Sequence, residues 1–171
     1  MITITGAAGF IGSALVARLH ADGFNDLVLV DDFKARPDKA RNHENRPCTA
    51  RVDRQDFPQW LRANEGQVQF VFHLGARTDT TEQDRGIFDQ LNLSYSQEIW
   101  RLCHEFGLSM VYASSAATYG GGEQGYSDDH AGVGRLKPLN PYGDSKQQFD
   151  LWALGEAEAG RAPYFWAGLK F

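Results

Sequence analysis

Three side chains of this sequence could together move a proton at an alcohol carbon: a phenol, an amine and a hydroxyl. Tyr142 and Lys146 are four residues apart, a spacing that places both on one face of a helix. Ser115 supplies the hydroxyl. A lysine ammonium beside a phenol favours the phenolate, because an opposite charge lowers a pKa that starts near ~10. The pair predicts that Tyr142 can act as a general base. The alternative is an ordinary amphipathic helix with a packed Tyr and a solvated Lys.

The N-terminal segment indicates what would bind beside this pair. A β-branched run over residues 1–5 is followed by Gly6, Gly9 and Gly12, and then by a helical pattern over residues 13–20. Glycines let the turn close tightly against a pyrophosphate, whose charge is stabilised by the N–H groups at the helix start. Strand, glycine turn and helix together predict a dinucleotide-binding unit. A glycine turn that only joins a strand to a helix is the simpler alternative.

An acidic residue at the expected distance supports the dinucleotide interpretation. The apolar run Leu27–Val30 ends at Asp31, 19 residues after Gly12. In dinucleotide-binding units, the acid that binds the adenosine ribose lies roughly 20 residues beyond the glycine turn. Asp31 is therefore the predicted ribose ligand.

The rest of the chain alternates strand and helix, which indicates an α/β fold with a parallel, doubly wound sheet of Rossmann type and helices on both faces. We expect one domain over residues 1–171. Residues 120–134 are rich in Gly, Asp and Ser and are expected to form an exposed loop. The other expected strands are 49–53, 69–73, 108–113 and 164–171, and the other expected helices are 57–63, 87–106 and the one carrying Tyr142 and Lys146.

Ligands bind outside the carboxyl ends of the strands in such a sheet. Candidate residues follow five of the strands, of which the first is followed by the glycine turn Gly6–Gly12. Asp53 could nevertheless be a helix cap, Gly75 a plain turn, and Asn92 a polar position on a helix. His73 ends an apolar strand and is expected to orient a loop, with no part in the chemistry. The candidates that follow the other strands are Asp31–Asp32, Asp53, Leu74–Ala76 and Ser114–Ser115.

Composition excludes several classes. The 171 residues include 42% hydrophobic and 23% charged residues, with a net charge of −5 and a pI near 5.5. This balance argues against a nucleic-acid surface, and no apolar run approaches the ~18 residues that suggest a membrane span. Met1 begins directly on a strand, so we expect no signal peptide and a cytoplasmic location. Cys48 and Cys103 lack metal-type spacing, which predicts reduced structural cysteines and no metal.

Taken together, the motifs resemble the extended short-chain dehydrogenase/reductase superfamily along the whole chain. Further stretches look most like the ADP-L-glycero-D-manno-heptose 6-epimerases within it. UDP-glucose 4-epimerases and nucleotide-sugar dehydratases, which share only the superfamily motifs, are the alternative. The superfamily motifs are Gly6-x-x-Gly9-x-x-Gly12, His73-Leu-Gly-Ala76, Asn92, Ser115 and Tyr142-x-x-x-Lys146, and the further stretches are residues 80–82, 112–120 and 137–146.

This resemblance implies a redox-neutral inversion at C6″ of a nucleotide-activated heptose, ADP-heptose, by transient oxidation with bound NADP, in lipopolysaccharide core precursor synthesis. It implies that Tyr142 removes the hydroxyl proton, that Lys146 lowers the pKa of Tyr142 and holds the nicotinamide ribose, and that Ser115 hydrogen-bonds the sugar oxygen. The implied substrate residues are Thr80, Thr81, Glu82 and Ser115, and the implied cofactor-binding residues are Gly6, Gly9, Phe10, Ile11, Gly12, Asp31, Asp32, Lys39, Asp53, Leu74, Gly75, Ala76, Asn92, Tyr142 and Lys146.

The choice between NAD and NADP depends on the residues around Asp31. A carboxylate that accepts a ribose hydroxyl favours NAD, whereas the heptose epimerases generally use NADP despite an acid here. Their next residue is commonly Asn, but this chain has Asp32, whose charge should repel a 2′-phosphate unless Lys34, Arg36 or Lys39 compensates. The resemblance favours NADP, with NAD as the alternative.

The chain ends where the relatives continue into the rest of the cofactor domain and a smaller substrate domain. We therefore expect a truncated domain that lacks the C-terminal substrate domain and the second acid/base lysine of these epimerases; Lys170 is not that residue. A catalytically incomplete dinucleotide-binding fragment remains an open alternative. Tyr164, Phe165, Trp166, Leu169 and Phe171 would lose apolar neighbours, which predicts a homo-oligomer or a partner over that face.

Overall fold

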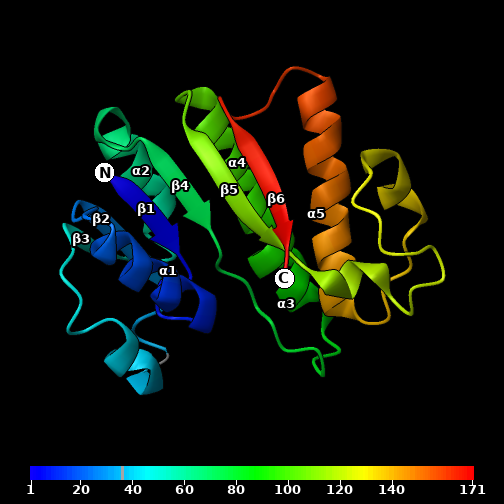
Figure 1. Ribbon diagram of the computed structural model, residues 1–171, viewed down its shortest axis with the longest axis horizontal. Helices are drawn as coiled ribbons and strands as arrows, with labels where there is room; N and C mark the ends of the chain where they lie inside the picture. The colour runs from blue at the N-terminus through cyan, green and yellow to red at the C-terminus, as the bar shows by residue number, and fades with distance from the viewer. Residues whose placement is uncertain (36) are drawn as a thin grey trace.

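A six-stranded parallel sheet forms the centre of the molecule (Figure 1). The computed structural model describes residues 1–35 and 37–171. The strands lie in the order β3-β2-β1-β4-β5-β6, and every neighbouring pair is parallel, so all carboxyl ends lie at one edge. The order reverses between β1 and β4. The strands are β1 (Ile2–Thr5), β2 (Leu27–Asp31), β3 (Ala50–Asp53), β4 (Phe70–His73), β5 (Ser109–Ser114) and β6 (Trp166–Lys170).

Helices cover both faces of this sheet, as β2 shows most clearly. Leu27 and Leu29 pack in one cluster with α1 (Phe10–Ala21), whereas Val28 and Val30 pack in the cluster that contains the other long helices. Successive side chains of a strand point to opposite faces, so these clusters lie on opposite sides. Burial on both faces explains the unbroken apolar run of β2. The other helices are α2 (Phe57–Asn64), α4 (Tyr95–Glu105) and α5 (Pro141–Glu158).

Trp100 is the centre of the larger cluster and is fully buried. Its indole N–H donates to the carbonyl of Arg161 at 2.9 Å, which satisfies the one polar group of the ring. Edge-on contacts with rings on α5, β5 and β6 meet at this residue of α4 and fix the position of α5 over β5 and β6. The ring partners are Tyr112, Phe149, Trp152 and Trp166, at centroid distances of 6.4, 6.2, 6.1 and 5.1 Å.

The doubly wound sheet predicted from the sequence is confirmed, while several boundaries differ. Helix α1 begins at Phe10, three residues earlier than predicted, so Gly12 lies in its first turn, and β6 begins two residues later than predicted. The expected loop over residues 120–134 contains a short 3₁₀ helix, η5 (His130–Arg135). The other 3₁₀ helices of the described residues are η1 (Pro37–Asn42), η2 (Glu65–Gln67) and η4 (Ala116–Tyr119).

The predicted continuous helix over residues 87–106 is the main departure. The chain forms a short α3 (Arg85–Phe88), then a π-helical segment η3 (Asp89–Ser94), and only then α4. Within η3 the Asn92 side chain is buried and bonds to segments outside its own helix. Such π segments occur frequently at functional sites. Among the helices of the described residues, none has the length and apolar character required to cross a membrane.

Candidate functional site

The glycine turn after β1 is so tight that side chains do not fit. Gly6 has φ +70°, and a Cβ there would lie 2.7 Å from the backbone N of Gly75. A Cβ on Gly12 would overlap the carbonyl oxygen of Gly6. The cap residue Gly9 offers no side chain, and the first turn of α1 carries no acid. The first N–H groups of α1 therefore stay available to an anion from outside the helix.

A buried hydrogen-bond chain holds the second side of this turn. The backbone N–H of Gly75 donates to the Thr5 hydroxyl at 3.1 Å, and that hydroxyl lies 2.9 Å from Nδ1 of His73. Nε2 of His73 lies 2.9 Å from the Ser96 hydroxyl on α4. Burial, followed by the charge of Lys146, lowers the pKa of His73 to about 3. His73 is thus a neutral positioning group for the loop after β4, which agrees with the role expected from its place in the sequence.

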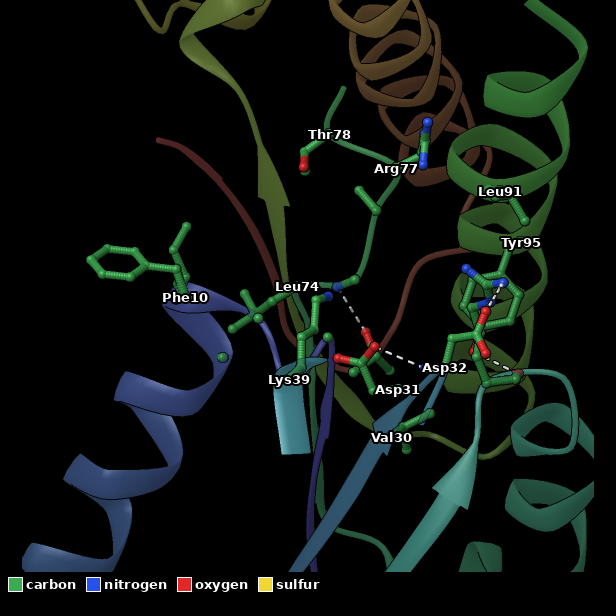
Figure 2. Close-up of a pocket in the computed structure, with 18 of the residues that line it drawn as sticks. Phe10, Val30, Asp31, Asp32, Lys39, Leu74, Arg77, Thr78, Leu91 and Tyr95 are labelled. Atoms are coloured by element: carbon green, nitrogen blue, oxygen red, sulfur yellow. Dashed lines mark hydrogen bonds and ion pairs between the residues drawn. The ribbon is translucent and has the colours of Figure 1, made fainter. Parts of the chain in front are cut away.

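A cavity of about 670 Å³ opens beside the glycine turn, at the carboxyl edge where the strand order reverses (Figure 2). In doubly wound sheets this is the place where ligands bind. The turn forms one wall, the end of β2 the floor, and the segment after β4 the other wall. Its lining residues are Thr5, Gly6, Gly9, Phe10, Ile11, Gly12, Val30, Asp31, Asp32, Ala35, Lys39, Arg54, Leu74, Gly75, Ala76, Arg77, Thr78, Leu91 and Tyr95.

Both carboxylates after β2 are anchored. Oδ2 of Asp31 accepts the backbone N–H of Ala8 at 2.9 Å, and Oδ1 accepts that of Asp32. These bonds fix the glycine turn over the end of β2. The Asp32 carboxylate forms an ion pair with Arg54 at 3.1 Å, and each side chain is 27% exposed. Lys39 also lines the cavity.

Helix α5 carries the predicted proton-transfer pair and begins with a well-formed cap. The Asn140 side chain accepts the backbone N–H of Gly143 at 2.8 Å, and Pro141 occupies the first turn. A Cβ on Gly143 would lie 2.8 Å from the carbonyl oxygen of Ala117. This glycine therefore lets the first turn of α5 approach the segment that follows Ser115. Tyr142, next to it, is half-buried, with its ring centroid 6.4 Å from that of Phe88.

Lys146 is only 5% exposed, and its ammonium donates to the carbonyl of Ala113 near the end of β5 at 2.7 Å. Burial lowers the pKa of Lys146 to about 8, while the charge of Asp150 opposes that shift. Ser115, 6% exposed, follows β5 directly, and its Oγ accepts the backbone N–H of Ala117 at 3.2 Å. The amine and the hydroxyl thus both lie at the end of β5, where α5 crosses it.

Other predicted residues lie outside the cavity lining. The Asp53 carboxylate accepts the backbone N–H of Gln55 at 3.2 Å, so the chain beyond β3 brings Arg54 into the cavity in its place. Asn92 is 1% exposed; its amide accepts the N–H of Arg77 and donates to the Arg77 carbonyl and to the Ser145 hydroxyl. It holds the cavity wall at Arg77 and ties that wall to α5. Tyr142, Lys146 and Ser115 are likewise outside the lining.

The predicted substrate loop lies in the segment after the cavity wall. Thr80 and Thr81 are exposed, and both the backbone N–H and the hydroxyl of Thr81 donate to Asp79. The Glu82 carboxylate lies 3.6 Å from the guanidinium of Arg77. These contacts connect the loop to the cavity wall, whereas no contact that the structure describes connects Thr80 to Tyr142.

Several site residues carry no sequence signal that we recognised. Arg54 follows a predicted strand by one residue, and the alternation of a strand does not say which of two adjacent residues turns inward. Tyr95 lies within the predicted helix 87–106, and nothing in that pattern marks it as a site residue. Its hydroxyl donates to the Arg54 carbonyl at 3.1 Å, and burial raises its pKa. Arg36, one of three predicted compensating cations, lies outside the described residues. Within the described ranges, no group of three His, Cys, Asp or Glu side chains could hold a metal ion.

Comparison with known proteins agrees with this geometry. Residues 2–167 match the model of the NAD dependent epimerase/dehydratase family. The ADP-L-glycero-D-manno-heptose-6-epimerase of Fusobacterium nucleatum is 40% identical over 175 residues, covering 100% of this chain and 52% of that protein. The enzyme of the same name from Nitratidesulfovibrio vulgaris is 46% identical over 158 residues, covering 91% of this chain and 49% of that protein. The chain thus spans about half the length of the curated relatives it matches.

Solved structures give the same picture. MoeE5 in complex with UDP-glucuronic acid and NAD superposes with a TM-score of 0.76 at 30% identity, over 99% of this chain and 54% of that chain. UDP-glucuronic acid 4-epimerase from Bacillus cereus superposes with a TM-score of 0.80 at 24% identity, over 99% and 55%; at this identity the likeness is one of fold. With its glycine turn, Asp31 and the Tyr142–Lys146 helix on one such sheet, the chain belongs to the NAD dependent epimerase/dehydratase family.

Proposed function

We propose that this chain is the dinucleotide-binding and proton-transfer half of a nucleotide-sugar epimerase of the ADP-L-glycero-D-manno-heptose 6-epimerase type, which inverts C6″ by transient oxidation with bound NADP. The observation that carries the proposal is the cavity of about 670 Å³ at the reversal of strand order, bounded by the glycine turn and Asp31. The names of the relatives at 40% and 46% identity support the heptose type.

The residues present fit a dinucleotide. A diphosphate would be held by the N–H groups at the start of α1, which neither a capping side chain nor an acid occupies. The carboxylate of Asp31, which lines the cavity, would bind ribose hydroxyls at the end of β2. Because Gly6 and Gly12 leave no room for a Cβ, the backbone itself forms the surface that approaches the ligand.

The proton-transfer groups then have separate tasks. When bound, the nicotinamide supplies a hydride acceptor and donor. Tyr142 removes the proton from the sugar hydroxyl and later returns it. The Lys146 ammonium favours the phenolate of Tyr142 and binds ribose hydroxyls, and Ser115 donates a hydrogen bond to the sugar oxygen as charge develops there. Thr80, Thr81 and Glu82 would border the sugar.

Charge pairing at the adenosine end favours NADP within this proposal. Asp32 would repel a 2′-phosphate if its charge were unpaired, but Arg54 lies 3.1 Å from it. Lys39 lines the same end of the cavity, where its ammonium can pair with a 2′-phosphate.

Titration of the chain with NADPH and NADH tests the cofactor assignment. We expect NADPH to bind about tenfold more tightly, which corresponds to ~1.4 kcal/mol, and Lys39→Ala to remove most of that preference. Arg41→Ala is the matched control, because Arg41 lies on the same short helix η1, is exposed and does not line the cavity. A preference for NADH, or equal losses in the two variants, contradicts the NADP assignment.

An assay for inversion of ADP-D-glycero-D-manno-heptose tests the activity, with a full-length relative as the positive control. We expect Tyr142→Phe to abolish turnover and to leave dinucleotide affinity within about twofold, because the ring still packs on Phe88 while the ionisable oxygen is gone. Turnover by Tyr142→Phe equal to that of the unmodified chain contradicts the assigned base.

A dinucleotide-binding module without catalysis is the second candidate. One observation favours it: the cavity lining stops short of Ser115, Tyr142 and Lys146. Tight dinucleotide binding without sugar inversion, while the full-length control is active, identifies this candidate. A preparation diluted into buffer without dinucleotide could lose inversion under either candidate function. Affinity and turnover must therefore be measured on the same preparation.

A further inference from the structure

Asp150 is a buried carboxylate to which the proposed function assigns no task. It lies on α5 one turn beyond Lys146 and is 5% exposed. Burying a carboxylate is costly unless other groups compensate its charge and satisfy its oxygens. Its neighbours therefore indicate what the carboxylate does.

Both oxygens of Asp150 are satisfied by β5. The Tyr112 hydroxyl donates to Oδ1 at 3.0 Å, and the Ser114 hydroxyl donates to Oδ2 at 2.6 Å. Tyr112 and Ser114 are two residues apart on the strand, so their side chains share the face that α5 covers. Between them, the carbonyl of Ala113 accepts from Lys146. Consecutive residues of β5 are thus bound to consecutive turns of α5, immediately before Ser115.

Asp150 and Lys146 also compensate each other's charge. Burial lowers the pKa of Lys146 and raises that of Asp150, and the charge of each residue opposes the shift of the other. The neighbouring titratable group on β4 is His73, which carries no charge near neutral pH because its pKa is about 3. Asp150 and Lys146 lie one helical turn apart and bind adjacent residues of β5, so the carboxylate is the acidic group whose charge acts on Lys146 over this short span.

The remaining charged groups around Asp150 lie on its other side. Lys170 on β6 lowers the pKa of Asp150 through its charge, and its ammonium lies 3.8 Å from Asp128. All three groups line a cavity of about 150 Å³, and His130 lines it as well. Lys170 thus faces Asp128 as well as Asp150, while Lys146 on the proton-transfer side has Asp150 as its acidic neighbour.

From this geometry we propose that Asp150 is a positioning residue: it fastens the end of β5, and with it Ser115, to α5, and it keeps Lys146 in the ammonium form that acts on Tyr142 and on the dinucleotide. The role of the ammonium rests on the proposed function. The link between Asp150 and Lys146 is a property of the chain itself and can be measured without turnover.

The direct test is an NMR titration of the Lys146 Cε resonance in chain labelled with ¹³C lysine. We expect a midpoint near pH 8 in the unmodified chain, as the pKa indicates, and one about one pH unit lower in the isosteric variant Asp150→Asn. Glu158→Gln is the matched control, since it removes an exposed acid from the same helix and should leave the midpoint in place. Equal midpoints in the unmodified chain and Asp150→Asn overturn the proposal.

Reciprocity supplies a second variant if Asp150→Asn does not fold. A coupling between two titrating groups acts equally on both, so Lys146→Met should raise the midpoint of the Asp150 Cγ resonance by the same amount, about one pH unit. Ser114→Ala removes one hydroxyl and keeps the carboxylate charge, and should leave the Lys146 midpoint within about 0.3 units. An unchanged Asp150 midpoint in Lys146→Met, or a full shift in Ser114→Ala, refutes the charge pairing.

Dinucleotide affinity connects the pair to the proposed function. At pH 7.5 a one-unit decrease in the pKa of Lys146 lowers its ammonium fraction about threefold, so Asp150→Asn should bind dinucleotide about threefold more weakly than Glu158→Gln. Shifted midpoints with unchanged affinity overturn the assigned role toward the dinucleotide. An unmodified chain that binds no dinucleotide refutes the proposed function, and the NMR midpoints still decide the link between Asp150 and Lys146.

Discussion

Replacing Gly6 by alanine would test the close approach that shapes the whole cavity. Gly6 adopts φ +70°, and the new Cβ would lie 2.7 Å from the backbone N of Gly75. That neighbour cannot move freely, because its N–H is bonded to Thr5 and thereby linked to His73. The variant therefore combines an unfavourable backbone conformation with an overlap against fixed backbone.

Gly107 allows the two costs to be separated. It adopts φ +63° at the end of α4, and a Cβ there would meet nothing within 4 Å. Gly107→Ala should therefore cost only the conformational part, about 1 kcal/mol. Gly6→Ala should cost that amount plus about 2 kcal/mol for overpacking, or about 3 kcal/mol in total. The difference corresponds to roughly a 30-fold change in the unfolding equilibrium.

Urea unfolding followed by circular dichroism measures both free energies of unfolding, and a dinucleotide titration follows on the folded proteins. We expect Gly6→Ala to bind at least tenfold more weakly and Gly107→Ala to bind as the unmodified chain does. If both variants lose the same stability and both keep their affinity, Gly6 and Gly75 do not form a fixed wall and the argument for the cavity fails.

Three further outcomes are expected. The pKa of His73 is about 3 in the folded chain and near 6.5 in the unfolded chain. The contribution of neutral His73 to the unfolding free energy is therefore fully present above pH 6.5 and is lost as the pH falls toward 3. Between pH 6.5 and pH 5, urea midpoints should show a loss of up to about 2 kcal/mol, and this loss should be absent in His73→Gln. Burial lowers the pKa of Lys146 from 10.5 to about 8, so the unfolding free energy of the unmodified chain should rise by about 3 kcal/mol as the pH rises from 8 through 10.5, and this rise should be absent in Lys146→Met. Light scattering should show that the chain self-associates, and Phe165→Ser should weaken this association. Phe24→Ser is the control and should not, since its ring is as exposed as that of Phe165 (51% and 52%) but lies elsewhere on the surface. A monodisperse monomer would contradict this expectation.

Much of the fold could be predicted because its signals are local. The apolar run of β2 is unbroken because both of its faces are covered, and the turn at Gly6 needs a residue without a Cβ. The π segment at Asp89–Ser94 could not be predicted, since a longer hydrogen-bond register leaves the apolar spacing of the helix almost unchanged. Its cause is tertiary: Asn92 reaches across to Arg77 and Ser145.

The site was predicted more completely at the glycine turn than elsewhere. There a spacing pattern specifies backbone geometry, so Gly6, Gly12 and Asp31 all lie around the cavity. The end of β3 at Asp53 was predicted correctly, but the alternation of a strand does not say which of the adjacent residues Asp53 and Arg54 turns toward the cavity. Trp166 was expected to be exposed but is half-buried against Trp100, since that contact joins segments far apart in the chain.

The π segment also limits how this part of the chain can vary in length. Asn92 must face Arg77 while Trp100 faces the sheet, and each residue of a helix turns it by about 100°. Deleting one residue between these two positions would turn either the amide or the indole away from its partners. Insertions and deletions between Asn92 and Trp100 should therefore be rare in related genes.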